Sequence, residues 1–331
     1  MIEVVDTGPL NTIQDLGRTG FRDIGVTVSG AMDPLALKVA NLLIGNDAGA
    51  AAIELQTFPF RVRFREQTAF AVTGGGAATL DGVAMPGWWG QTAGAGQVLE
   101  VTPVAGSARG YVAFGGGIDV EPVMGSRSTS LRGAFGGMEG RSLKKGDLLP
   151  LGGATICGIA ADGFGVVPPL LEMAALFPVA DNGTLLIRAL PAGEHDLFGA
   201  DAERFWNQTW KISSQSDRTG YRLAGDPIRP MAPVEMRSHG IVAGVVQVPP
   251  AGEPIIQMSD ANTAGGYPKI AGIIEADLWR LGQARSGSRL RFVRSSHAEA
   301  RMLDKAIADY LEDIRATSQM VERALRTISG R

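Results

Sequence analysis

The sequence is poor in cysteine, in aromatic residues and in excess charge of either sign. Cys157 is the one cysteine among 331 residues, so no intrachain disulfide can form, and its apolar neighbours indicate a buried thiol without a catalytic role. Lys and Arg number 31 and Asp and Glu 34, giving a net charge of -3. This balance offers no electrostatic surface for nucleic acid or an anionic membrane, so we expect neither as a partner.

Hydrophobic runs long enough to cross a membrane are also missing. The most apolar stretch, residues 165–180, contains three prolines and a glutamate and would make a poor membrane helix. The first residues, Met1 to Asp6, show no signal-peptide pattern. These absences predict a soluble cytoplasmic protein.

Motifs for metals and for common catalytic groups are absent as well. The three histidines, His195, His239 and His297, stand far apart and lack the spacing of zinc ligands. There is no Walker P-loop, no Gly-x-Gly-x-x-Gly opening a helix, no Gly-x-Ser-x-Gly nucleophile elbow and no Met-Lys-Met biotin-carrier motif. The sequence therefore predicts no metal site.

Glycine is abundant instead. The 45 glycines separate short apolar segments, a texture typical of a mainly β protein with many tight turns. Asp81-Gly82 predicts a hairpin turn, whereas Thr12 to Gly25 is too polar and glycine-rich for a regular element. Strands are expected at residues 2–5, 52–56, 61–64, 69–73, 78–80, 97–101, 110–114, 185–190 and 290–293.

The clearest helix signal begins at Asp33, a good N-cap that is followed by Pro34. From Leu35 onward, apolar residues recur at i, i+4, i+7 and i+8, as on a helix packed against a core. Gly45-Asn46 should end this helix. Further helices are expected at residues 203–210 and from residue 297 to the C-terminus.

One stretch, Pro254 to Ala271, concentrates chemically useful side chains. Two apolar runs, expected to be core strands, bracket a polar loop with Asp260, Gly265-Gly266, Tyr267 and Lys269. Paired glycines let backbone approach a ligand closely and expose N–H groups. The residues alone leave two interpretations open: a ligand-binding loop, or a hairpin with a Gly-Gly turn and solvated polar side chains.

An internal similarity links two parts of the chain. Arg18 to Gly25 and Arg218 to Gly225 share five identical positions and an aromatic pair. Duplication of a β subdomain would explain it, and chance similarity in a glycine-rich chain is the alternative. Each arginine could bind a carboxylate or phosphate, or tie its own loop to carbonyl groups. The hydroxyl-rich run Ser126 to Ser130 could cradle an anion.

Several motifs resemble one family. Gln247 to Ile255 reads Gln-x-Pro-Pro-x-Gly-x-Pro-Ile, and Asp260 to Pro268 reads Asp-x-x-Thr-x-Gly-Gly-Tyr-Pro. Both are similar to the second-subunit half of the allophanate hydrolase/carboxyltransferase family. Further matches are Ser29-Gly-Ala-Met-Asp-Pro-Leu-Ala-Leu, Asn41-Leu-Leu-Ile-Gly-Asn, Gly115-Gly-Gly-Ile-Asp and Gly125-Ser-Arg-Ser-Thr-Ser-Leu.

The resemblance covers residues 4–293 and implies two cyclophilin-like β-barrel subdomains, at about 4–155 and 184–293. Residues 295–331 lie outside it and form a C-terminal helical extension. His239 stands where related sequences more often have an acidic residue, a departure that could change the substrate or merely cap a turn.

The family includes the C subunit of the bacterial ATP-dependent 5-oxoprolinase, also described as a Kip-type antagonist. That membership implies opening of the 5-oxoproline lactam to L-glutamate, with ATP bound on this chain or by a partner. It also implies two partners: a first-subunit homologue of the Kip-inhibitor type, which is the B subunit of that complex, and a LamB/YcsF-type protein, which is its A subunit. We favour this interpretation.

Two other functions remain open. The family also includes the carboxyltransferase part of urea carboxylase, which implies biotin-dependent carboxyl transfer to urea or a related amide. Other chains would then have to supply biotin and the ATP-dependent step. The Kip name instead implies a non-enzymatic antagonist that binds a kinase-inhibitor protein.

The loop chemistry and the resemblance together nominate a site. Asp260 and Lys269 are the candidate catalytic residues: a lysine there could neutralise a carboxylate or phosphoryl group, and an aspartate could hold a substrate N–H or accept a proton. A surface ion pair is the alternative. The candidate substrate-binding residues are Arg18, Arg218, Gln247, Gly265, Gly266 and Tyr267.

Overall fold

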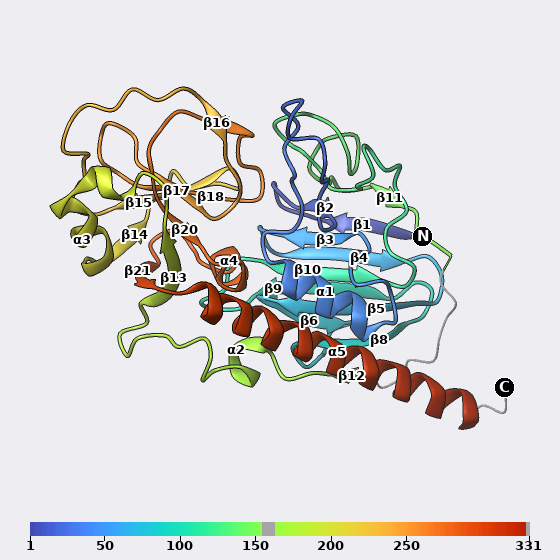
Figure 1. Cartoon of the computed structure of the whole chain (residues 1–331). Coiled ribbons are helices and arrows are strands. Elements are labelled where there is room, and N and C mark those ends of the chain that lie inside the picture. Colours follow the sequence, from blue (N-terminus) through green and yellow to red (C-terminus); the bar gives the residue numbers. More distant parts are fainter. Residues whose placement is uncertain (154–162, 329–331) are drawn as a thin grey trace. The chain divides into compact units, whose positions relative to one another are not determined.

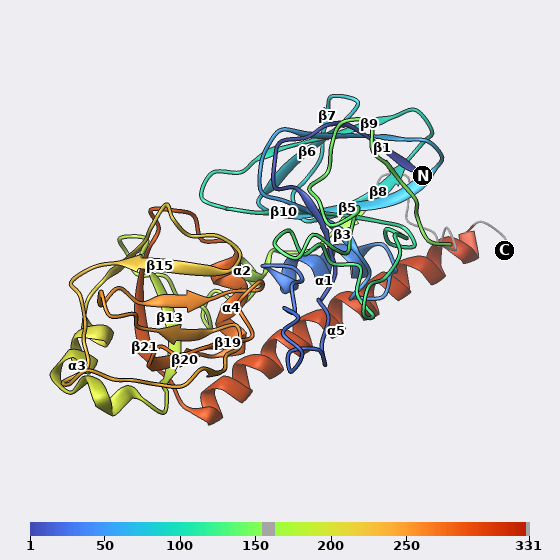
Figure 2. The same cartoon turned by 90° about the horizontal axis from the view of Figure 1, so that it is seen from above.

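The computed structural model describes residues 1–153 and 163–328, so Cys157 lies outside the described residues. The fold is mainly β with a long C-terminal helix, which confirms the predicted class. The chain divides into two compact units (Figures 1 and 2). The first contains Met1–Arg18, Ser29–Pro168 and Ala308–Arg331, and the second contains Thr19–Val28 and Pro169–Ile307.

The first unit contains two six-stranded antiparallel sheets, ordered β11-β1-β4-β9-β6-β7 and β12-β8-β5-β10-β3-β2. Asp81 and Gly82 both have positive φ and form the predicted turn between β6 and β7. The strands are β1 (Ile2–Asp6), β2 (Thr12–Gln14), β3 (Ala52–Leu55), β4 (Phe60–Phe64), β5 (Thr68–Gly74), β6 (Gly76–Leu80), β7 (Val83–Ala84), β8 (Trp89–Ala93), β9 (Val98–Pro103), β10 (Gly110–Phe114), β11 (Leu148–Leu149) and β12 (Phe164–Gly165).

One expectation for this unit was wrong. The segment from Thr12 to Gly25 does contain a regular element, β2, which pairs with β3 from Thr12↔Glu54 to Gln14↔Ala52. All three residues of β2 are buried. A polar strand of this kind is stabilised by a partner that lies about 40 positions away in the sequence, which local composition does not reveal.

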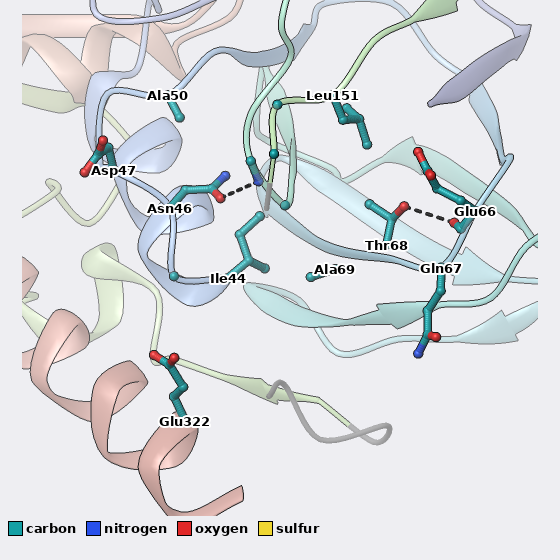
Figure 3. Close-up of a pocket in the computed structure, with 15 residues that line it drawn as sticks. Ile44, Asn46, Asp47, Ala50, Glu66, Gln67, Thr68, Ala69, Leu151 and Glu322 are labelled. Atoms are coloured by element: carbon teal, nitrogen blue, oxygen red, sulfur yellow. Dashed lines mark hydrogen bonds between the residues drawn. The ribbon is translucent and has the colours of Figure 1, made fainter. Parts of the chain in front are cut away.

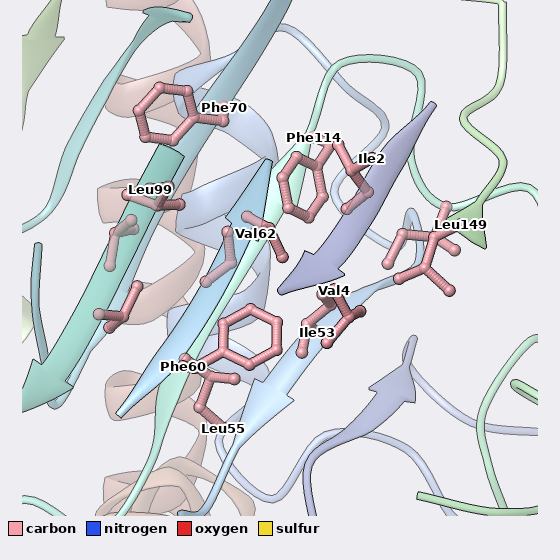
Figure 4. Close-up of a cluster of buried hydrophobic side chains, with 14 of the residues drawn as sticks. Ile2, Val4, Ile53, Leu55, Phe60, Val62, Phe70, Leu99, Phe114 and Leu149 are labelled. Atoms are coloured by element: carbon pink, nitrogen blue, oxygen red, sulfur yellow. The ribbon is translucent and has the colours of Figure 1, made fainter. Parts of the chain in front are cut away.

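The core of the first unit is apolar and is drawn in Figure 4. Strand β4 shows how the sequence builds it: Phe60, Val62 and Phe64 are buried, while Arg61 and Arg63 alternate with them on the other face. Each such side chain stabilises the fold by about 1.5–3 kcal/mol when it leaves water.

Helix α1 (Pro34–Leu43) begins and ends as predicted, with the Asp33 carboxylate accepting a hydrogen bond from Ala36 N–H at 2.9 Å. A buried polar cluster supports this end of the helix. Tyr111 donates its hydroxyl hydrogen to Glu54 at 2.7 Å and accepts from Asp33 N–H at 2.8 Å. Burial, with the neighbouring Glu54 charge, raises the pKa of Tyr111 well above its usual value.

The second unit is built on a closed barrel, ordered β13-β20-β17-β18-β15-β14-β21, in which β13 and β21 are parallel. A separate pair, β16 and β19, lies outside the barrel order. The barrel strands are β13 (Leu185–Pro191), β14 (Trp210–Ile212), β15 (Gly220–Ala224), β17 (Val245–Gln247), β18 (Ile255–Gln257), β20 (Lys269–Ile273) and β21 (Arg289–Arg294). The outer pair is β16 (His239–Gly240) and β19 (Ala264–Gly265).

Short helices complete the second unit: α2 (Pro169–Glu172), the 3-10 turn η1 (His195–Phe198), α3 (Ala200–Asn207) and α4 (Glu275–Gly282). The predicted helix over residues 203–210 exists, but its bounds were wrong, since α3 ends at Asn207. Trp210 instead begins β14, because its backbone pairs with Leu290 of β21. Its indole N–H still donates to the carbonyl of Phe205 in α3, at 3.0 Å.

Helix α5 (His297–Ile328) is amphipathic and confirms the predicted C-terminal helix. Its residues up to Ile307 belong to the second unit and the later ones to the first. In the first unit, Tyr310 and Ile314 are buried, and the Tyr310 hydroxyl donates to the carbonyl of Val167 at 2.8 Å. Among the described residues, no helix is both long and apolar enough to span a membrane.

Candidate functional site

The loop that carries most of the predicted site residues joins β18 to β20 in the second unit. Strand β17 lies between these two strands in the barrel, so the stretch is not a hairpin. Midway along the loop, β19 pairs with β16, which sets Gly265 opposite His239. The plain hairpin interpretation was therefore wrong, because a strand that lies earlier in the chain inserts between the two runs.

Arg218 and Asp260, two of the predicted residues, lie together. Arg218 Nε lies 2.8 Å from Asp260 Oδ2 and Nη2 lies 3.3 Å from Oδ1, and the two side chains are only 8% and 13% exposed. The backbone adds a third link, from Asp260 N–H to the Arg218 carbonyl at 2.9 Å. Asp217 caps the same turn by accepting from Thr219 N–H at 2.7 Å. This geometry gives a nearly buried, two-point ion pair.

Lys269 lies at the start of β20 and has a partner that the sequence did not suggest. Its Nζ lies 3.1 Å from Glu194 Oε2, and the same oxygen accepts from Lys269 N–H at 3.0 Å. Glu194 follows β13, whose pairing with β20 brings the two together. Only knowledge of that strand pairing could have found it, because the two residues are 75 positions apart.

Gln247, Gly265 and Tyr267 also come together. The Gln247 amide donates to the Tyr267 carbonyl at 3.3 Å and accepts from Gln257 Nε2 at 3.1 Å. A Cβ on Gly265 would lie 2.8 Å from Gln247 Nε2. The glycine therefore lets the loop backbone close over a buried glutamine pair. Gly266 similarly makes room for the carbonyl of Met236, 3.0 Å from where its Cβ would stand.

A cavity of about 760 Å³ opens beside this loop, and we call it the Tyr267 cavity. It is lined by residues 229–236, 248–250 and 266–268. Gly266 and Tyr267 are thus the predicted residues that border it, and Lys269 follows directly after its last lining residue. Tyr267 is 46% exposed, so its ring is available to a ligand.

Arg18 belongs to the first unit and is 1% exposed. Its guanidinium donates to the carbonyls of Ser128 and, from Nε at 3.4 Å, Val123. It also lies over the Phe135 ring, 4.7 Å from the centroid. These contacts tie the Arg18 loop to carbonyl groups of a distant segment of the chain, which is the structural alternative that the sequence left open.

The hydroxyl-rich run Ser126 to Ser130 binds a carboxylate of the same chain, that of Asp15. Ser126 and Ser128 donate their hydroxyls to Asp15 Oδ1 at 2.6 and 2.5 Å, and Arg127 N–H donates to Oδ2 at 2.6 Å. The suggested anion cradle therefore holds the Asp15 carboxylate. Phosphate oxygens would have to displace it.

Another cavity, of about 620 Å³, lies in the first unit (Figure 3). Asn46, at the end of α1, joins two of its walls: Oδ1 accepts from Gly116 N–H at 2.9 Å, and Nδ2 donates to the Phe114 carbonyl at 2.8 Å. Its charged lining side chains are the carboxylates of Asp47, Glu66 and Glu322. Such a lining repels a triphosphate, so these residues do not fit ATP.

Two of the three histidines, His195 and His239, make local contacts. His195 Nε2 accepts from the indole of Trp206 at 3.1 Å, and its Nδ1 lies 3.1 Å from Asp196. His239 Nδ1 lies 2.9 Å from the Arg237 carbonyl. Within residues 1–153 and 163–328, no group of three or more His, Cys, Asp or Glu side chains could hold a metal ion.

Residues 24–294 match the model of the carboxyltransferase domain, subdomain A and B. The chain belongs to this carboxyltransferase domain family. It is 44% identical over 302 residues to the C subunit of 5-oxoprolinase from Escherichia coli strain K12, with 91% of this chain and 93% of that protein covered. The corresponding 5-oxoprolinase C subunit of Haemophilus influenzae is 39% identical over 317 residues, covering 95% and 98%.

Solved structures of the family agree with the fold. The crystal structure of Kluyveromyces lactis urea carboxylase superposes with a TM-score of 0.83 at 30% identity. That match covers 96% of this chain and 29% of the urea carboxylase. The mainly β architecture described above is therefore shared with one part of a much longer protein.

Proposed function

We propose that this carboxyltransferase-family chain is a subunit of an ATP-dependent 5-oxoprolinase complex that opens the 5-oxoproline lactam to L-glutamate. The observation that carries the proposal is reciprocal coverage. The two 5-oxoprolinase C subunits align over 93% and 98% of their own length, whereas the urea carboxylase aligns over 29%. A chain that aligns with a whole C subunit is expected to act as the equivalent subunit of a similar complex.

The chemical problem is the weak electrophilicity of a lactam. Phosphorylation of the carbonyl oxygen by ATP activates the carbonyl carbon. One water adds to that carbon and the ring C–N bond breaks as the nitrogen takes up a proton, which leaves an acyl phosphate. A second water then displaces phosphate together with the original carbonyl oxygen, so both oxygens of the new carboxylate come from water. In this scheme Lys269, held by Glu194, offsets the negative charge that develops at the carbonyl. Asp260, held by Arg218, accepts the lactam N–H.

ATP is assigned in this proposal to a partner subunit. The described residues support that choice, since the cavity of the first unit is lined by carboxylates and the hydroxyl-rich run is bound to Asp15. The proposed partners are a first-subunit homologue and a LamB/YcsF-type protein. They would complete a site to which this chain contributes the β18–β20 loop.

The test is reconstitution. This chain would be mixed with the first-subunit homologue and the LamB/YcsF-type protein, and glutamate release from 5-oxoproline measured with and without ATP. Each protein would be omitted in turn. Glutamate release that requires ATP and all three proteins supports the proposal. Folded, associated proteins that release no glutamate would refute it.

A second candidate is biotin-dependent carboxyl transfer to urea or a related amide. It is favoured by the description of the family model and by the urea carboxylase superposition. The same loop residues would then position carboxybiotin and the acceptor nitrogen. Transfer of labelled carboxyl from carboxybiotin to urea, measured with the same preparation, separates this candidate from the first.

A further inference from the structure

The lining of the Tyr267 cavity is poor in backbone N–H donors. Five of its fourteen lining residues are prolines, which have no backbone N–H to offer a ligand: Pro230, Pro233, Pro249, Pro250 and Pro268. Methionine and valine side chains supply much of the remaining lining. An anionic ligand in this cavity would therefore depend on side-chain donors.

Arg229 is the one cation among the residues that line the cavity. Its backbone N–H is held by Asp201 Oδ2 at 2.8 Å, which fixes the start of the lining segment. Its guanidinium has no hydrogen bond or ion pair with any residue of the described ranges. This distinguishes it from Arg218 and Lys269, whose charges already have carboxylate partners.

The cavity also borders the proposed chemistry. Pro268 lines it and is followed immediately by Lys269, while Val248 lines it and follows Gln247. A small ring seated here would lie against the apolar side chains and the Tyr267 ring, in a lining whose charged residues are Arg229 and Glu235, so the guanidinium is the group there that attracts an anion. A guanidinium matches a carboxylate through two parallel N–H donors.

We propose that Arg229 binds the carboxylate of 5-oxoproline in the Tyr267 cavity and so determines specificity for a lactam that carries an acid group. The inference rests on the proposed function and adds to it the residue that selects the substrate. It also explains how a lactam acid would be preferred over urea, which has no carboxylate to pair with Arg229.

The experiment measures steady-state kinetics of the reconstituted complex with Arg229→Gln, Arg229→Lys and a control, Arg291→Gln. Arg291 is an exposed arginine on β21 that does not line the cavity. Arg229→Gln should raise KM for 5-oxoproline on the order of 10- to 100-fold with little change in kcat, because a charge-assisted hydrogen-bond pair is lost. Arg229→Lys should recover part of the loss, and the control should match wild type.

A second ligand separates carboxylate recognition from a general defect. The ring 2-pyrrolidinone has the same lactam without the acid group, and its inhibition constant should be the same for wild type and Arg229→Gln. An unchanged KM in Arg229→Gln, or equal weakening of both ligands, overturns the inference while the proposed function stands. A wild-type complex that releases no glutamate overturns both.

Discussion

Arg218 and Asp260 stand 42 positions apart in the sequence and meet in a two-point ion pair, with Nε to Oδ2 at 2.8 Å and Nη2 to Oδ1 at 3.3 Å. The pair joins the start of β15 to the loop after β18, so it ties the candidate site to the barrel wall. Removing one partner would leave the other charge nearly buried, a costly state in a protein interior.

Asp260→Asn should therefore destabilise the chain by about 3 kcal/mol. The double variant Arg218→Met/Asp260→Leu should regain most of that loss, because it removes both charges and keeps the volume. Urea unfolding of the isolated chain measures both. Equal unfolding midpoints for wild type and Asp260→Asn would show that solvent already screens the pair.

The proposed role of Lys269 can be tested by the turnover of the reconstituted complex. In the reconstituted complex, Lys269→Met should lower kcat by a factor on the order of 10² to 10³, the usual cost of losing a group that stabilises developing charge. Lys211→Met, an exposed lysine on β14, is the matched control and should retain wild-type turnover. A Lys269→Met complex that turns over normally would remove Lys269 from the mechanism.

The parts of the fold that could be predicted are those specified by neighbouring residues. Helix α1 carries its own cap, proline and apolar stripe, and the Asp81-Gly82 dipeptide itself favours a two-residue hairpin turn. Helix α4 was missed because its buried face includes Asp277, a residue that local patterns assign to solvent. Arg188, 89 positions away, makes that burial possible by donating from Nε to Asp277 Oδ2 at 3.0 Å.

In the candidate site too, the residues that could be predicted are those marked by a local motif, and the ones missed depend on distant parts of the chain. Gly265 and Tyr267 could be nominated from one short motif, because a glycine pair beside an aromatic residue is visible in the sequence. Glu194 could not, since only the pairing of β13 with β20 places it against Lys269. Arg229 was missed because nothing local separates a cation that borders a cavity from one on the surface.

Gly265 offers a test of loop packing. A methyl group at Gly265→Ala would lie 2.8 Å from Gln247 Nε2, whose hydrogen bonds to Gln257 and the Tyr267 carbonyl leave little freedom to move. The variant should lose about 1–3 kcal/mol of stability through overpacking. Gly240→Ala is the control, on the paired strand, where an added Cβ meets nothing within 4 Å. Thermal unfolding that shifts equally in both would contradict the packing argument.

Asp147 gives the chain a predictable response to acid. Burial alone would raise the pKa of Asp147, but hydrogen bonds from Arg141, at 2.8 and 2.9 Å, and from Lys144 N–H outweigh it and hold the pKa below its usual value. A carboxyl whose pKa is lowered by folding stabilises the fold above its unfolded pKa, near 3.9, and loses that contribution as pH falls through the folded value.

Asp147→Asn should therefore lower the thermal midpoint at neutral pH, and the difference from wild type should shrink at pH values below about 4. Glu121→Gln is the control, because Glu121 is exposed and its carboxylate makes no hydrogen bond with the described residues. Its midpoint should follow that of wild type at every pH. A difference for Asp147→Asn that stays constant down to acid pH would mean that the Arg141 pair contributes nothing to stability through ionisation.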